Sequence, residues 1–191
     1  MLVAIDIGNV CLELHIAEAV EKLGIDPTRD FPAEIRSLCS DYAVGAVSSQ
    51  DFLHSMAAFT GLSELQVKES WESEIGTAIP GMDDAIRKCV ANGVEFVFLS
   101  DTNDLHMTKI RRTLSFVHLV KGAILSQEVG ATKPSPEIYS AFEKKYGKPD
   151  LYFDDLQKNI DGAIRFGWDA VRFTGPDDFY KHIEAKRAGR R

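Results

Sequence analysis

Apolar residues form three short uninterrupted runs in this chain, and each run ends at an acid or a hydroxyl. The runs cover residues 2–5, 96–99 and 151–153, and the polar residues that follow them are Asp6, Ser100 with Asp101, and Asp154 with Asp155. Uninterrupted runs of this length are typical of strands buried on both faces of a parallel sheet. Ligands bind at the carboxyl ends of such strands, so the pattern predicts a chemical site at one sheet edge.

Between the first two runs, apolar positions recur at helical spacing. We expect four amphipathic helices and no strand between Glu13 and Glu74. The residues that mark their apolar faces are Ile16, Val20 and Leu23; Ile35, Leu38 and Tyr42; Phe52, Met56 and Phe59; and Leu65 and Trp71. Ser63 and Gln66 have the spacing of a capping box, which predicts the start of the fourth helix.

From Pro80 onward, helical and strand patterns alternate. The predicted helices are 82–92, 104–114, 136–146, 157–166 and 177–186, and the predicted strands are 94–99, 123–125, 151–153 and 170–173. This alternation indicates an α/β core formed by residues 1–12 and 80–191, interrupted by a helical insertion at 13–79. Because the insertion leaves and returns near Asp6, its position fits a lid over the predicted site.

Composition narrows the possible partners. A chain of 191 residues with a net charge of −7 suits one core with a modest insertion, and its acidity argues against nucleic acid or an anionic membrane. No stretch is long and apolar enough to span a bilayer, and the start lacks the pattern of a signal peptide. Three scattered cysteines do not suggest a disulfide framework. We therefore expect a cytoplasmic protein, monomeric or weakly dimeric.

The sequence predicts several oxygen ligands near Asp6. A lone Asp after a strand could be a metal ligand, a nucleophile or a cap. Gly8 allows the backbone to approach a ligand and offer its carbonyl, Asp154 adds a carboxylate, and Asp155 could act through water. Such a hard-oxygen set suits Mg²⁺, and the chain has no His or Cys pair with zinc spacing.

Lys133 lies in the loop 130–136, which is punctuated by glycine and proline. A single lysine is usually solvated at the surface. Together with the three strand ends, however, this lysine suggests a positive charge for a phosphate group.

Four segments resemble, in order, the four motifs of the haloacid dehalogenase (HAD) superfamily. They are Asp6-Ile7-Gly8-Asn9-Val10, Leu99-Ser100-Asp101-Thr102-Asn103, Lys133-Pro134 and Phe153-Asp154-Asp155. The resemblance implies a Rossmann-like parallel sheet in a three-layer α/β/α core, with a small helical type 1 cap after the first strand. It also implies a phosphatase that acts on a small phosphorylated metabolite.

In the mechanism that the resemblance implies, Asp6 attacks phosphorus and forms an aspartyl-phosphate. Mg²⁺ would be held by Asp6, the Gly8 carbonyl and Asp154, with Asp155 as a further candidate ligand. Ser100 and the amides after it would bind phosphoryl oxygens, and Lys133 would balance charge.

Two positions depart from the family pattern. Most phosphatases of this superfamily have an acid where this chain has Gly8, and general acid catalysis contributes about 10²–10⁴-fold. We therefore expect a substrate with an acidic leaving oxygen, such as a sugar 1-phosphate. Asp101 stands where relatives commonly have Asn, and we expect it to face away from phosphate or bind a substrate hydroxyl.

Weaker candidates and two alternative functions stay open. His106 could replace the missing acid, Glu13 and His15 could reach the site, and an aromatic set consisting of Tyr42, Phe52 and Trp71 favours cap core over a sugar platform. The alternatives are a metal-independent dehalogenase, against which the two neighbouring acids argue, and a non-catalytic ligand-binding protein on the same fold.

Overall fold

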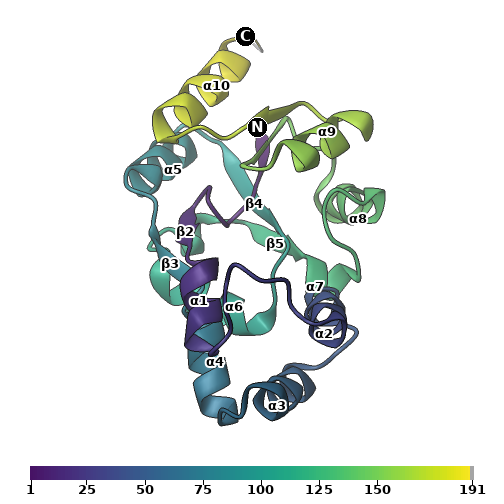
Figure 1. Cartoon of the computed structure of the whole chain (residues 1–191). Coiled ribbons are helices and arrows are strands. Elements are labelled where there is room, and N and C mark those ends of the chain that lie inside the picture. Colours follow the sequence, from purple (N-terminus) through teal and green to yellow (C-terminus); the bar gives the residue numbers. More distant parts are fainter. Residues whose placement is uncertain (190–191) are drawn as a thin grey trace.

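A parallel five-stranded sheet forms the centre of the computed structural model, which describes residues 1–189 (Figure 1). The strands are β1 (Leu2–Ile5), β4 (Glu95–Ser100), β5 (Gly122–Leu125), β6 (Leu151–Asp154) and β7 (Ala170–Arg172). Their order is β5-β4-β1-β6-β7, and every pair in this sheet is parallel. The central position of β1 brings Asp6 between the ends of β4 and β6.

Helices cover both faces of the sheet. Because successive strand residues point to opposite faces, Ile5 and Phe98 pack on one side while Ala4 and Leu99 pack on the other. The first face is covered by α5 (Met82–Ala91), α6 (Asp104–Thr113) and α10 (Pro176–Ala188), and the second by α8 (Pro136–Tyr146) and α9 (Gln157–Arg165). These three layers confirm the predicted α/β fold class.

The segment between β1 and β4 contains the four expected helices. They are α1 (Ile16–Lys22), α2 (Ala33–Ala43), α3 (Ser49–Thr60) and α4 (Glu64–Glu72). A separate apolar cluster holds them together, composed of Leu23, Ile35, Tyr42, Phe52, Leu53, Met56 and Val67. The predicted capping box of Ser63 and Gln66 is present at the start of α4. In Figure 1 these helices lie at the end of the molecule away from the chain termini.

Three of the predicted face residues are exposed instead of buried, namely Ile16, Phe59 and Leu65. The helices are short and pack around one small cluster, so only part of each apolar face finds a partner. Helical spacing predicts which residues share a face, but it does not predict how much of that face a neighbour covers.

The prediction of no strand between Glu13 and Glu74 is wrong at its first two residues, and a second strand follows directly after Glu74. Leu12–Leu14 form β2, which pairs antiparallel with β3 (Ile75–Ala78) at the other end of the insertion. Strands of three and four residues carry almost no periodic signal, and their partners lie about sixty residues apart in the chain. Two short elements are not predicted by the sequence pattern, η1 (Val117–Leu119) and α7 (Ser126–Val129). Among residues 1–189, no helix combines the length and apolar character needed to cross a membrane.

Candidate active site

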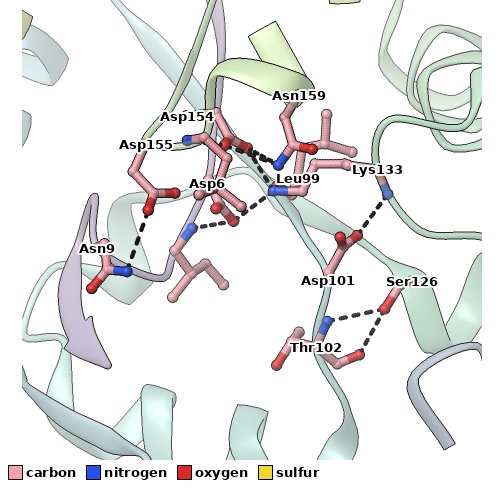
Figure 2. Close-up of polar contacts among 12 residues, drawn as sticks. Asp6, Asn9, Leu99, Asp101, Thr102, Ser126, Lys133, Asp154, Asp155 and Asn159 are labelled. Atoms are coloured by element: carbon pink, nitrogen blue, oxygen red, sulfur yellow. Dashed lines mark hydrogen bonds and ion pairs between the residues drawn. The ribbon is translucent and has the colours of Figure 1, made fainter. Parts of the chain in front are cut away.

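Polar residues at the carboxyl ends of β1, β4 and β6 meet at one edge of the sheet (Figure 2). The backbone amide of Asp6 donates to the Phe153 carbonyl at 2.9 Å, which extends the pairing of β1 and β6 by one step. Asp6 is therefore held by its own main chain beside Asp154. Lys133 enters the same space from the loop between α7 and α8.

Lys133 connects the two carboxylates. Its Nζ lies 2.9 Å from Asp6 Oδ1 and 2.8 Å from Asp154 Oδ2, and it also donates to the Leu99 carbonyl at 3.2 Å. Its side chain is buried, and burial alone would lower the pKa of the ammonium. The charges of Asp6 and Asp154 outweigh that effect and raise the pKa, so the lysine is a permanent cation.

Asp154 is completely buried, and donors surround both of its oxygens. Oδ1 accepts from the Leu156 amide at 2.9 Å and from Asn159 Nδ2 at 3.0 Å. Oδ2 accepts from Lys133 and from the Tyr152 hydroxyl. These hydrogen bonds hold the Asp154 carboxylate in place and fix the position of the lysine.

The two carboxylate oxygens of Asp6 differ in their contacts with the rest of the described chain. Oδ1 accepts from the Ile7 amide at 2.7 Å and pairs with Lys133, whereas Oδ2 has no hydrogen-bond partner within residues 1–189. Burial raises the pKa of Asp6 to about 7, although Lys133 opposes the shift. A divalent cation beside this carboxylate would lower its pKa and keep it ionised at neutral pH.

The donor set beside Asp6 fits a divalent cation of the Mg²⁺ type. Ligand oxygens from Asp6, Asp154 and Asp155 lie within 4.8 Å of one another, and within the described chain these form the sole such acidic cluster. Asp155 lines the cavity at the site and accepts from Asn9 Nδ2 at 3.3 Å. Gly8 lines the same cavity, with its carbonyl as a further oxygen donor. Oxygen-only ligands of this kind are those that Mg²⁺ prefers.

Ser100 and Asp101 lie at the end of β4, with different surroundings. Ser100 is buried and lines the cavity, and its hydroxyl makes no hydrogen bond to any residue of the described chain. Asp101 also borders the cavity, but its Oδ1 accepts from the backbone amide of Lys133 at 2.9 Å. This carboxylate therefore attaches the lysine loop to β4 (Figure 2).

The backbone amides beyond Asp101 are less available for phosphate binding than the sequence predicts. The Thr102 amide donates to Ser126 Oγ at 3.0 Å, and the Asp104 amide donates to Gln127 Oε1 at 2.8 Å. Side chains of α7, a helix that was not predicted, thus occupy these two donors.

A cavity of about 230 Å³ extends from this cluster toward the insertion helices. Its lining includes Asp6, Ser100 and Lys133 on the sheet edge, and Leu14, Ile16 and Glu74 from the insertion. The volume is below the roughly 300–1,000 Å³ of sites for drug-sized ligands, so the cavity suits a small ligand. Glu74 was not among the predicted site residues, because its access to the cavity depends on the pairing of β2 with β3.

The weaker candidates lie outside the cavity or have other partners. His106 borders the cavity, but both ring nitrogens are engaged: Nε2 donates to the Trp71 carbonyl at 3.0 Å and Nδ1 accepts from Asn103 Nδ2 at 3.3 Å. Burial lowers the pKa of His106 to about 4, so the ring is neutral at physiological pH.

The remaining candidates divide into polar and aromatic residues. Glu13 contacts Thr77 and His15 at the surface, and neither Glu13 nor His15 lines the cavity. The aromatic set, consisting of Tyr42, Phe52 and Trp71, packs together among the insertion helices, with Tyr42 stacked on Phe52 at 4.2 Å.

No protein-family model matches this sequence. Its fold is similar to that of the HAD family enzyme BT-2542 from Bacteroides thetaiotaomicron, with a TM-score of 0.80 and 19% identity over 95% of this chain and 97% of that one. A second structure of that enzyme, in complex with magnesium and inorganic phosphate, matches with a TM-score of 0.77, 20% identity and coverage of 91% and 94%.

The L-2-haloacid dehalogenase from Xanthobacter autotrophicus, with chloropropionic acid covalently bound, is more distant. Its TM-score is 0.63 at 13% identity, over 90% of this chain and 76% of that chain. The chain therefore has the fold of the HAD superfamily, as its four motifs predict. Since phosphate-binding and dehalogenating proteins share this fold, the fold alone does not decide between them.

Proposed function

We propose that this protein is a HAD-type, Mg²⁺-dependent phosphatase that hydrolyses a small phosphorylated metabolite through an aspartyl-phosphate. The observation that carries the proposal is the pairing of a carboxylate that has one free oxygen, Asp6, with a buried cation, Lys133, beside further carboxylates. The similar enzyme BT-2542 binds magnesium and phosphate in its own structure, which supports the same chemistry here.

Each residue has a role that follows from its position. Lys133 holds Asp6 Oδ1, so that Oδ2 is the oxygen presented to the phosphorus atom. The Ser100 hydroxyl, which has no protein partner in the described chain, donates to a phosphoryl oxygen. Asp101 contributes by holding the backbone of Lys133, and it is also placed to accept from a substrate hydroxyl. Residues 13–79 act as the cap over the site.

The carboxylates of the site have two different roles in this proposal, namely metal binding and the positioning of Lys133. Asp6, Asp155 and Gly8 line the cavity, and the two carboxylates and the Gly8 carbonyl are the direct ligands in this proposal. Asp154 is not part of the cavity lining and its oxygens accept hydrogen bonds from four donors, so it positions Lys133 and completes the acidic cluster. This assignment reverses the order expected from the sequence, in which Asp155 was the outer member. When bound, Mg²⁺ supplies Lewis-acid stabilisation of the phosphoryl charge, worth several kcal/mol.

A screen of metabolite phosphates with Mg²⁺, run beside Asp6→Asn, tests the function. We expect phosphate release that EDTA abolishes and that Asp6→Asn reduces to the blank, since the amide is a poor nucleophile. If no residue of the cavity protonates the leaving oxygen, sugar 1-phosphates are expected to exceed sugar 6-phosphates, because the anomeric oxygen is the more acidic leaving group. Chloride release from 2-chloropropionate that persists in EDTA would instead identify a dehalogenase, and binding of metabolite phosphates without turnover would indicate a non-catalytic protein.

A further inference from the structure

The structure provides no acid at position 8, and the space there is already filled. A Cβ atom added to Gly8 would lie 2.6 Å from Leu14 Cδ1. The proton that a leaving oxygen needs must therefore come from another part of the cavity wall. His106 cannot supply it, because its one N–H already donates to the Trp71 carbonyl.

Among the carboxylates that line the cavity, Glu74 is the one without a hydrogen-bonded partner. Asp6 pairs with Lys133, Asp101 accepts from the Lys133 amide, and Asp155 accepts from Asn9. The Glu74 carboxylate accepts no hydrogen bond from residues 1–189, and Nε2 of the neutral His106 lies 4.0 Å from it.

The location of Glu74 is fixed by secondary structure. It follows α4 and directly precedes β3, and its carbonyl accepts from the His15 amide at 2.8 Å beside the β2–β3 pair. The side chain is 20% exposed, and it borders the cavity on the side of the insertion, where the leaving group must lie if the phosphoryl group contacts Asp6. Figure 1 shows α4 and β3 beside α6, the helix that carries His106.

We propose that Glu74 is the catalytic acid and base of this site, in place of the residue missing at position 8. This inference rests on the proposed phosphatase function. In the first step, Asp6 Oδ2 bonds to phosphorus while the bond to the leaving oxygen breaks, and that oxygen takes its electron pair and the Glu74 proton. In the second step, water attacks phosphorus, gives a proton to the Glu74 carboxylate, and the bond to Asp6 breaks with its electron pair returning to Asp6.

The surroundings of Glu74 support both of its protonation states. Burial raises the pKa of Glu74 to about 7, so the acid and the carboxylate are both populated near neutral pH. The groups that face it are His106 from α6, which is neutral, and Cys39 from α2, whose own pKa is raised to about 11 by burial and by the charge of Glu74. Neither neighbour is charged at neutral pH, so neither one fixes Glu74 in a single form.

The role of Glu74 is tested by how kcat/KM depends on the acidity of the leaving group. We would measure kcat/KM with Mg²⁺ for an alkyl phosphate, phenyl phosphate and p-nitrophenyl phosphate, using wild type, Glu74→Gln and Glu72→Gln. Glu72 is the matched control, because it ends α4 two residues before Glu74, is 21% exposed, pairs with Lys68 at 3.7 Å and does not line the cavity. Glu74→Gln should lose about 10²–10⁴-fold on the alkyl phosphate and less than tenfold on p-nitrophenyl phosphate, whose leaving group needs no proton.

The outcomes separate this inference from the function on which it rests. An equal loss on all three substrates, or no loss, would overturn the role of Glu74 while leaving the phosphatase intact. If wild type turns over none of the substrates of this series or of the metabolite screen, the proposed function itself fails. Should Glu74→Gln not fold, the wild-type series still decides: a shallow dependence on leaving-group acidity is expected, and a steep one contradicts an acid in the site.

Discussion

Replacing Lys133 by Met should destabilise the protein strongly, because the lysine is the one cation that contacts both Asp6 and Asp154 within residues 1–189. Methionine keeps most of the side-chain volume but leaves two buried carboxylates without a positive partner. The substitution also removes the donor to the Leu99 carbonyl. Removing one partner from a buried ion pair costs about 3–5 kcal/mol, and we expect a loss in that range.

The assay is urea unfolding at pH 7, with the free energy obtained by linear extrapolation. Lys121→Met is the matched control, since Lys121 Nζ lies 3.0 Å from Glu95 Oε1 in a pair that is about half exposed. An exposed pair contributes about 0–1 kcal/mol, so the control should change little despite its similar distance. The comparison isolates burial as the cause.

A double variant strengthens the argument. Asp154→Asn removes one of the two charges that Lys133→Met leaves unpaired, so the double variant should lose less than the sum of the single changes. If Lys133→Met loses less than 1 kcal/mol, as the Lys121 control is expected to, the view that this lysine stabilises two buried carboxylates is refuted.

Two further predictions concern the metal ligands and the buried histidine. Asp155→Asn should raise the Mg²⁺ concentration for half-maximal activity by more than about tenfold, whereas Asp161→Asn, an exposed change in α9, should not; equal metal requirements would remove Asp155 from the ligand set. His106 has a folded pKa of about 4, below the unfolded value of about 6.5, so the unfolded chain takes up its proton first and stability falls as the pH drops from 6.5 toward 4. The stability difference between wild type and His106→Gln should therefore shrink by about 3 kcal/mol between pH 7 and pH 4, and a pH-independent difference in urea unfolding would contradict the buried neutral ring.

The sequence predicts the sheet edge well because one rule connects it to the fold. Parallel strands place their carboxyl ends side by side, so residues that follow unbroken apolar runs, such as Asp6, Ser100 and Asp154, must come near one another. Lys133 has no periodic signal of its own, so it could be added only from its glycine- and proline-containing loop taken together with the three strand ends, before the resemblance to known motifs supported it.

Two features of the site could not be predicted in this way. Asp154 and Asp155 are adjacent in the chain, and only the packing of Tyr152 and Asn159 around Asp154 shows which carboxylate is enclosed and which borders the cavity. Glu74 reaches the cavity because β3 pairs with β2, a contact between distant segments that leaves no local pattern in the sequence.

The contact between Gly8 and Leu14 makes these two positions interdependent in evolution and in protein engineering. An Asp at position 8 would force the Leu14 side chain to move, and because Leu14 also borders the cavity, the same change would reshape the space for substrate. Placing an acid at position 8 therefore involves Leu14 as well, and the effect of a substitution at either position depends on the residue at the other. A descendant of this chain would reach the common motif more readily after Leu14 had become smaller, and variant libraries should randomise both positions together.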